Sequence, residues 1–275
     1  MPELPEVETT RRGIATIMTG RVLERFTVYE SRMRWPIPAD MGSRVTGQQV
    51  LSCERRGKYL LLNFAHGTQI VHLGMSGSIR RAPLDQPRLK HDHVEWVFGD
   101  ARFLLHDPRR FGAVLWHDLA DGPLSGHPLL ARLGIEPFDA NFTGRHLHQG
   151  LKGKTQAIKQ ALLAGHIVVG VGNIYASEAL FKARINPQAR SGSLSLARCE
   201  TLATAIRQTL TQALESGGST LRDYVNATGE AGAYFSLHAA VYDHAGKPCA
   251  ICETPIRRII QGQRATYYCP VCQRR

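Results

Sequence analysis

The stretch HVEWVFGDARFLLH, residues 93–106, decides the fold of the first half of the chain. It contains two short runs rich in β-branched, aromatic and aliphatic residues, and the pair Gly99-Asp100 separates them. Two such runs around a Gly-Asp pair predict a β-hairpin with a two-residue turn. We therefore expect antiparallel sheet, not helix, in this part of the chain.

Similar strand-like segments surround this hairpin from about residue 21 to 118. They are short, apolar or aromatic, and separated by turn residues; they are RVLERFTV (21–28), KYLLLNF (58–64), TQIVHL (68–73) and AVLW (113–116). Ahead of them, residues 5–18 are predicted to form a helix, because Pro5 suits a first helical position and apolar residues recur on one face. The expected structure is a β-sandwich with a leading helix, and Pro2 and Glu3 are expected to lie just before this helix on a short exposed lead.

The second half of the chain changes to helical periodicity. The helical segments are TQAIKQALLA (155–164), IYASEALFKA (174–183) and residues 196–214. Residues 216–246 contain five glycines without a clear period, which predicts a long flexible loop. We expect an α+β multidomain protein with an N-terminal β-sandwich domain, a helical domain and a C-terminal zinc ribbon, divided as 1–135, 136–236 and 237–275.

The composition narrows the classes of partner. Lys and Arg outnumber Asp and Glu by 34 to 23, which gives a net charge of +11 and favours a polyanionic partner. Solubility alone would also account for such a charge. No apolar run approaches the roughly 18 residues that a membrane helix needs, so we expect no membrane contact. The start MPELPEVETTRR lacks the apolar core of a signal peptide, which favours a cytoplasmic location.

Four of the six cysteines form two Cys-x-x-Cys pairs, with the 16 residues 253–268 between them. Six cysteines would also allow a disulfide set, but the spacing in a reducing compartment favours a four-thiolate zinc site. The expected ligands are Cys249, Cys252, Cys269 and Cys272. Because protein would fill all four positions, this single zinc ion is expected to be structural, and the other two cysteines, Cys53 and Cys199, are expected to be buried.

The residues between the two cysteine pairs are expected to form a β-hairpin. IRRII and QRATYYC alternate around Gln261-Gly262 and carry several arginines, which suits a surface that faces DNA. A zinc ribbon is common among binding modules. The ribbon therefore does not by itself decide whether the chain is an enzyme.

The start Pro2-Glu3-Leu4-Pro5-Glu6-Val7-Glu8, together with the ribbon, resembles the formamidopyrimidine-DNA glycosylase family. The resemblance covers nearly the whole chain through segments in the same order: RRGKYLLL (55–62), HLGMSGS (72–78), KHDH (90–93), DPRRFGA (107–113), GVGNIYASE (170–178) and QRATYYC (263–269). It implies a monomeric base excision repair enzyme, associated with the nucleoid, that binds double-stranded DNA containing oxidised purines or abasic sites.

The implied enzyme is a glycosylase and abasic-site lyase that excises 8-oxoguanine and formamidopyrimidines and cleaves the strand by β,δ-elimination. Removal of Met1 would expose the secondary amine of Pro2, which can attack the deoxyribose C1′ and leave an iminium ion. Glu3 would donate or shuttle protons. From local sequence alone, Pro2 would be a lead-in to the helix and Glu3 a surface acid.

Two cations complete the implied catalytic set. Lys58 would assist the elimination and contact DNA, although by itself it would be a solvated lysine at the edge of a strand. Arg264 would promote the second elimination, although an isolated arginine there would be a plain phosphate clamp.

The resemblance also implies a set of DNA contacts. Met75, Arg109 and Phe111 would fill the stack vacated by an extruded nucleotide, although taken singly Met75 and Phe111 would be ordinary core residues. His91 and Arg110 would contact phosphates, and a histidine in KHDH would serve equally well as a structural residue.

A helix-two-turn-helix is implied in the helical domain. Its Asn173 would cap a helix whose backbone N–H groups bind phosphate. Lys152, Lys154 and Lys159 would contact the backbone, although Gly153 interrupts the family's lysine-rich stretch. The glycines before Asn173 also suggest a nucleotide-binding loop, but no G-x-x-x-x-G-K-[ST] follows, which excludes an NTPase of that type.

Two other functions fit part of the sequence. A relative of endonuclease eight shares the terminal proline, the helical clamp and the ribbon but prefers oxidised pyrimidines. A non-catalytic DNA-binding zinc protein would explain the charge and the cysteines, but not the Pro2-Glu3 start. The PELPEVE start and the set of Met75, Arg109 and Phe111 favour the purine enzyme.

Overall fold

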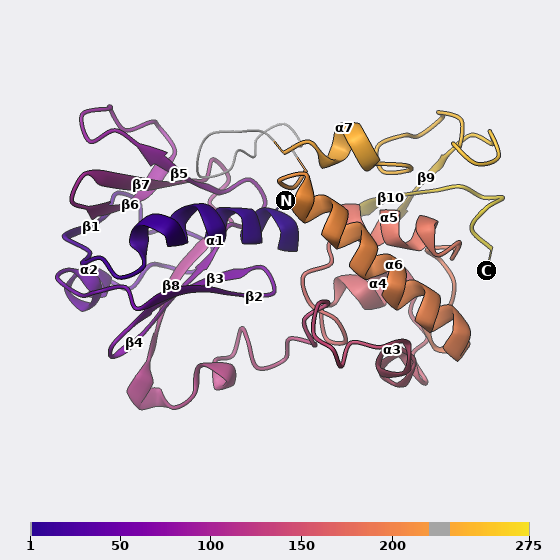
Figure 1. Cartoon of the computed structure of the whole chain (residues 1–275), viewed down its shortest axis with the longest axis horizontal. Coiled ribbons are helices and arrows are strands. Elements are labelled where there is room, and N and C mark those ends of the chain that lie inside the picture. The colour runs from indigo at the N-terminus through magenta and orange to yellow at the C-terminus, as the bar shows by residue number, and fades with distance from the viewer. Residues whose placement is uncertain (1, 220–231, 275) are drawn as a thin grey trace. The chain divides into compact units, whose positions relative to one another are not determined.

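The computed structural model describes residues 2–219 and 232–274. The chain forms two compact units (Figure 1). The N-terminal unit comprises Met1–Ala131 and Ser216–Phe235, and the C-terminal unit comprises Arg132–Glu215 and Ser236–Arg275.

The N-terminal unit contains two antiparallel sheets of four strands each. The first has the order β1 (Arg25–Val28), β6 (Asp92–Phe98), β7 (Ala101–His106), β5 (Ser78–Ala82). The second has the order β2 (Ser52–Arg56), β3 (Tyr59–Phe64), β4 (Gly67–His72), β8 (Ala113–Asp118). Phe98 pairs with Ala101 across Gly99-Asp100, so the expected hairpin and the expected sandwich are confirmed.

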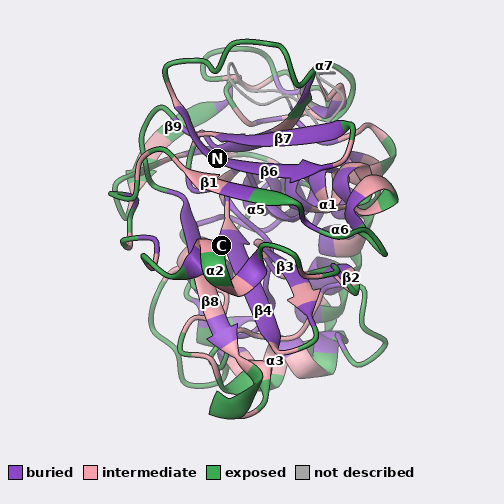
Figure 2. Ribbon diagram, turned by 90° about the vertical axis from the view of Figure 1, so that its left-hand side faces the viewer, coloured by how far each residue is buried: buried purple, intermediate pink, exposed green. Residues whose placement is uncertain are grey.

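Two strands of this unit were missed in the sequence. β2 (SCERR) and β5 (SIRRA) each lie at the edge of their sheet, where a strand can carry charged side chains such as the exposed Glu54 and Arg81. The strands β4, β6 and β7 are buried along most of their length (Figure 2). A short helix, α2 (Met41–Val45), was also not expected.

The leading helix α1 (Leu4–Met18) begins one residue earlier than the sequence indicated. Its N-cap is Glu3, which forms a capping box with Glu6. Pro2 and Glu3 are buried, so the expectation of an exposed lead was wrong. The capping box accounts for Glu3, because it turns this side chain back onto the helix instead of leaving it in solvent.

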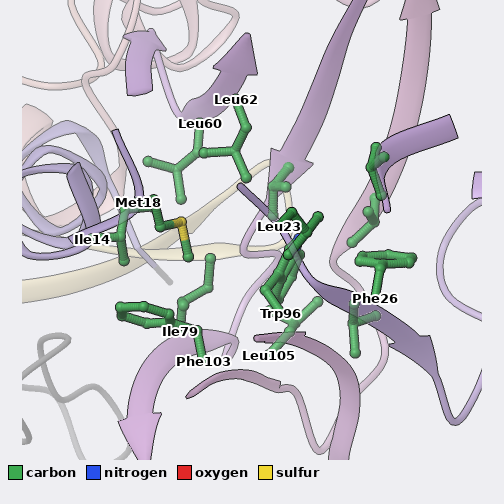
Figure 3. Packing of buried hydrophobic residues seen from close by; sticks show 14 of the residues in the cluster. Ile14, Met18, Leu23, Phe26, Leu60, Leu62, Ile79, Trp96, Phe103 and Leu105 are labelled. Atoms are coloured by element: carbon green, nitrogen blue, oxygen red, sulfur yellow. The ribbon is translucent and has the colours of Figure 1, made fainter. Parts of the chain in front are cut away.

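The core of the N-terminal unit draws on both sheets and on α1. Figure 3 shows Ile14 and Met18 of α1 beside Leu60 and Leu62 of β3, with side chains of β5, β6 and β7 completing the cluster. Trp96 is fully buried, and its indole Nε1 donates to Gln69 Oε1 at 2.8 Å. A buried indole N–H without a partner would be costly, so this bond lets the largest side chain occupy the core.

The C-terminal unit is mostly helical, as expected. Its helices are α3 (Gly144–Leu151), α4 (Ile158–Leu163), α5 (Asn173–Lys182) and α6 (Leu196–Glu215). It also contains a short 3-10 helix, η3 (Ser191–Ser193). The corresponding 3-10 helices of the N-terminal unit are η1 (Leu119–Asp121) and η2 (Leu124–Gly126). Helix α3 was missed because its sequence GRHLHQGL contains glycines and histidines of low helix propensity. None of the described helices is long and apolar enough to span a membrane.

The predicted loop at 216–246 is only partly described. Ser219 and Ala233 form an isolated bridge, and α7 (Tyr234–His238) follows, so this part is not without structure. Residues 220–231 of the predicted loop lie outside the described residues.

The ribbon hairpin consists of β9 (Arg257–Gln261) and β10 (Arg264–Tyr268). Gln261 pairs with Arg264, so the turn is Gly262-Gln263, one residue later than expected. Both turn residues have positive φ, 52° and 61°, as a type I′ turn requires.

We predict that Leu105→Ala lowers the free energy of unfolding of the N-terminal unit by about 2–5 kcal/mol, because the mutation leaves a cavity in a packed core. Leu105 is fully buried, whereas Leu119, the control, is 64% exposed. The three tryptophans, Trp35, Trp96 and Trp116, all belong to this unit, so their fluorescence during urea unfolding reports on it. A loss of similar size for Leu119→Ala would contradict this account of the core.

Candidate active site

The start of α1 is fixed by a network of carboxylates. Glu6 Oε2 accepts the backbone N–H of Glu3 at 2.8 Å, and the Glu3 carboxylate accepts the N–H of Glu6 in return. The other oxygen of Glu6, Oε1, accepts from Ser219 N at 2.7 Å and Ser219 Oγ at 3.0 Å. The residue pair Pro2-Glu3 is therefore held by the helix and by the segment at Ser219 within the same unit.

A second network joins α1 to the turn that carries Lys58. Glu8 binds Arg11 and Arg12 of its own helix, and Arg55 Nε lies 3.2 Å from Glu8 Oε2. Arg55 also donates to Gly57 O at 2.9 Å, beside Lys58. Burial raises the pKa of Glu8, but the hydrogen bonds from Arg11 and Arg12 and the nearby charges outweigh it and lower the pKa to about 2. Glu8 is therefore ionised at neutral pH.

Lys58 lies in the two-residue turn between β2 and β3, so the strand begins at Tyr59 and not at Lys58. The pKa of His72 is lowered to about 4. Burial is the largest cause, and the positive charges of Lys58 and Arg34 lower it further. His72 is thus neutral at pH 7, and its Nδ1 accepts the N–H of Gly74 at 3.0 Å. Sequence reasoning missed this histidine, because burial beside a cation leaves no pattern along the chain.

Met75 and Phe111 are exposed, unlike ordinary core residues. Each is 42% exposed, and the Arg109 guanidinium carbon lies 4.8 Å from the centre of the Phe111 ring. The structure therefore places Arg109 and Phe111 together on one loop, and Met75 on the loop after β4. Both apolar side chains are therefore accessible for contact with a partner.

In the N-terminal unit, the two residues expected to bind phosphate have different surroundings. His91 is half-buried, with its ring centre 5.9 Å from that of His106. Arg110 is exposed, has a positive φ of 55°, and its Nη1 lies 3.4 Å from Glu30 Oε2.

In the C-terminal unit, Asn173 and Arg264 come from neighbouring elements. Asn173 is the first residue of α5, and its Nδ2 donates to Ala265 O at 3.0 Å and to Tyr242 Oη at 3.3 Å. Asn173 therefore does not cap the helix as expected; Gly172 occupies the N-cap position. Because Ala265 follows Arg264, this bond ties the start of α5 to the strand that carries the arginine.

Lys152 and Lys154 are exposed at the end of α3 and in the following loop, as phosphate contacts require. Lys159 is fully buried, so its expected role as a phosphate contact was wrong. Its Nζ donates to Thr266 Oγ1 at 2.8 Å and to Ala265 O at 3.2 Å. A buried ammonium group needs such partners, and here they anchor the ribbon strand to α4.

Glu178 of α5 was not recognised in the sequence either. Its buried carboxylate accepts the backbone N–H groups of Ala240, Val241 and Tyr242 at 2.8, 3.0 and 2.7 Å. Burial raises the pKa of Glu178, and these three bonds oppose that rise. They fix the segment before the ribbon and so place Tyr242 against Asn173.

The four ribbon cysteines fit a zinc ion. Their sulfur atoms all lie within 4.8 Å of one another. Individual Sγ–Sγ distances are 3.4 Å for Cys252–Cys272, 3.5 Å for Cys252–Cys269 and 3.9 Å for Cys249–Cys272. Tetrahedral zinc with Zn–S bonds of about 2.3 Å needs sulfurs about 3.8 Å apart. Four thiolates leave no open position, so the ion would hold the ribbon and take no part in chemistry.

Comparisons with known protein families match nearly the whole chain. Residues 1–114 match the formamidopyrimidine-DNA glycosylase N-terminal domain, residues 133–225 its H2TH domain, and residues 246–275 the zinc finger found in FPG and IleRS. Together with the capped Pro2-Glu3 terminus, the sandwich and the four-thiolate ribbon, they define a zinc-ribbon DNA glycosylase.

Relatives and solved structures identify the family. The formamidopyrimidine-DNA glycosylases of Bordetella pertussis and Burkholderia thailandensis are 66% and 57% identical, and each match covers 100% of both chains. A point mutant of the Lactococcus lactis FPG, solved in complex with a Fapy-dG containing DNA, has a TM-score of 0.91 at 32% identity, over 100% of both chains. The Thermus thermophilus Fpg protein has a TM-score of 0.88 at 36% identity, over 99% of this chain and 98% of that one. This chain belongs to the formamidopyrimidine-DNA glycosylase family.

We predict that Cys252→Ala loses bound zinc, because three thiolates cannot complete the tetrahedral site. Elemental analysis of the purified protein should find about one zinc per chain for the unaltered protein and little for the variant. The matched control is Cys199→Ala, which removes a fully buried thiol outside the cluster and should keep the full zinc content. Full zinc content in Cys252→Ala would contradict this ligand set.

Proposed function

We propose that this chain is a bifunctional DNA glycosylase and abasic-site lyase of base excision repair that removes 8-oxoguanine and formamidopyrimidines. The observation that carries the proposal is the Pro2-Glu3 terminus, fixed by the capping box with Glu6. A proline amine freed by removal of Met1 is a nucleophile, and the carboxyl group beside it can supply a proton.

In the proposed reaction the Pro2 nitrogen attacks C1′ of the damaged nucleotide and forms the N–C1′ bond, while the glycosidic bond breaks and the base leaves. Glu3 provides the proton that allows the sugar ring to open. The resulting iminium ion accepts the electrons released when the C2′ hydrogen is lost, and the 3′ phosphate is expelled. Lys58, in the turn braced by Arg55, assists this elimination. Arg264 promotes the second elimination, which expels the 5′ phosphate.

The proposed DNA contacts lie in both units. Met75, Arg109 and Phe111 would enter the space vacated by the extruded nucleotide, since all three are exposed. The proposed phosphate contacts are His91, Arg110, Lys152, Lys154 and Asn173. Lactococcus lactis relatives have been solved with DNA containing Fapy-dG and with DNA containing an abasic site, which supports the same substrates here.

The rival substrate class is oxidised pyrimidines. A Lactococcus lactis relative has also been solved with DNA containing an oxidised pyrimidine, so binding alone does not separate the two classes. We propose that the rate of excision separates them, with oxidised purines preferred. A non-catalytic DNA-binding protein would show no covalent intermediate with either substrate.

We further propose that the protein works as a monomer in the cytoplasm, at the nucleoid where its substrate lies. The proposed division of labour assigns the chemistry to residues 1–135, the helix-two-turn-helix to residues 136–236, and the zinc ribbon to residues 237–275.

We predict that Pro2→Gly loses most of the covalent complex that borohydride traps on a duplex with 8-oxoguanine opposite cytosine. Glycine offers only a primary amine of different geometry, so the reaction should slow by at least about 100-fold, a typical loss for an altered nucleophile. Binding to the same duplex should persist, because it depends on other residues.

The control for this experiment is Lys58→Ala. It should still form the trapped complex, more slowly, because the nucleophile is intact. Normal trapping by Pro2→Gly together with complete loss in Lys58→Ala would assign the nucleophile to Lys58 instead. A stronger signal on an oxidised pyrimidine than on 8-oxoguanine would favour the rival substrate class.

A further inference from the structure

Two loops of the N-terminal unit carry the side chains that we propose to replace the extruded nucleotide. The Met75 loop comprises residues 73–77, and the Phe111 loop comprises residues 107–112. We propose that Asp107 is a positioning residue that holds these loops together as one rigid body, so that their side chains enter the duplex together. The proposal rests on the function assigned above to Met75 and Phe111.

The Asp107 carboxylate receives hydrogen bonds from both loops. Asp107 is fully buried. Its Oδ1 accepts from Ser76 Oγ in the Met75 loop at 3.1 Å and from Arg109 N in the Phe111 loop at 3.3 Å. Its Oδ2 accepts from Gly112 N at 2.8 Å. A carboxylate suits this position because it offers about four acceptor sites, whereas an amide offers half as many.

The backbones of the two loops also touch. Gly74 has a positive φ of 66°, and a Cβ at this position would lie 2.5 Å from both Gly112 N and the carbonyl carbon of Phe111. No side chain fits into that space, so Gly74 permits a contact that any other residue would prevent. Asp107 thus bridges two segments that are already packed against each other.

The bridging residue is itself anchored to the first sheet. Asp107 N donates to His91 O at 2.9 Å, and His93 Nε2 lies 2.8 Å from Asp107 O. His93 belongs to β6, which is buried along its whole length. These bonds fix the backbone of Asp107, the first residue of the Phe111 loop, to the start of β6, and the carboxylate then ties both loops to that fixed point.

Holding the Met75 loop and the Phe111 loop rigidly would help the protein to extrude a nucleotide. Flipping a base out of the duplex costs a few kcal/mol of unstacking, which inserted side chains must offset. Side chains that are already ordered lose less entropy on insertion and so offset more of that cost. Met75 and Phe111 are each 42% exposed, so both side chains are accessible to solvent before DNA arrives.

Ser76→Ala tests the proposal. It removes the hydrogen bond from the Met75 loop to the Asp107 carboxylate, while the bonds from Arg109 N and Gly112 N remain. We expect single-turnover excision of 8-oxoguanine opposite cytosine to slow by at least about tenfold, the size expected for one bond to a charged acceptor. Cleavage at a preformed abasic site, where no base has to be extruded, should change less than about twofold.

Asp107→Asn is the second variant. It should also slow excision of 8-oxoguanine more than cleavage at an abasic site. The loss should be larger than for Ser76→Ala, because the amide N–H would face a group that is itself a hydrogen-bond donor. Ser52→Ala is the matched control. Its hydroxyl donates to the Glu54 carboxylate at 2.9 Å and accepts from Asn63 Nδ2 at 2.8 Å in the same unit, and its loss should change neither rate. Melting temperatures of all variants show whether each is folded.

Phe111→Ala separates the two proposals. If it slows 8-oxoguanine excision and Ser76→Ala costs less in that background than alone, the loops act as one body. Equal losses on both substrates for Ser76→Ala and Asp107→Asn, or no loss, would overturn the role of Asp107 and leave the proposed function intact. An unchanged rate in Phe111→Ala would instead overturn the function assigned to the loop.

Discussion

The reciprocal hydrogen bonds between Glu3 and Glu6 are the constraint on which the proposed chemistry depends. They define where α1 begins, and so they fix the two residues ahead of the helix that would carry out the reaction. The same Glu6 carboxylate binds Ser219, from a segment more than 200 positions along the chain. A terminal residue would ordinarily fray. Here the buried helix start gives it a defined place.

The same device recurs at two other places. Glu6, Asp107 and Glu178 are all buried, and each accepts hydrogen bonds from backbone N–H groups that lie outside the named helices and strands. Burying a carboxylate is costly unless its oxygens are bonded, so each can persist only with its segment in place. These bonds hold loops rigidly on the sandwich and on the helical unit. Catalytic and DNA-binding side chains need such rigid support to keep a fixed position.

Local patterns in the sequence predicted the sandwich, the leading helix, the main helices and the ribbon, because alternation, helical periodicity and cysteine spacing are local signals. The polar edge strands β2 and β5 gave no such signal. Lys159 showed the limit most clearly: its charge suggested phosphate, yet its neighbours in space are Thr266 and Ala265, more than 100 positions away. The motif residues could be named from a family resemblance, but the buried carboxylates that hold them depend on tertiary contacts.

The central claim is that the terminal amine of Pro2 forms the covalent intermediate. The most direct test is to trap the protein on 8-oxoguanine DNA with borohydride, digest the complex and locate the modified residue by mass spectrometry. The account predicts that the sugar remnant is attached to the nitrogen of Pro2, in a peptide that lacks Met1. Attachment to Lys58, or trapping by protein that retains Met1, would contradict it.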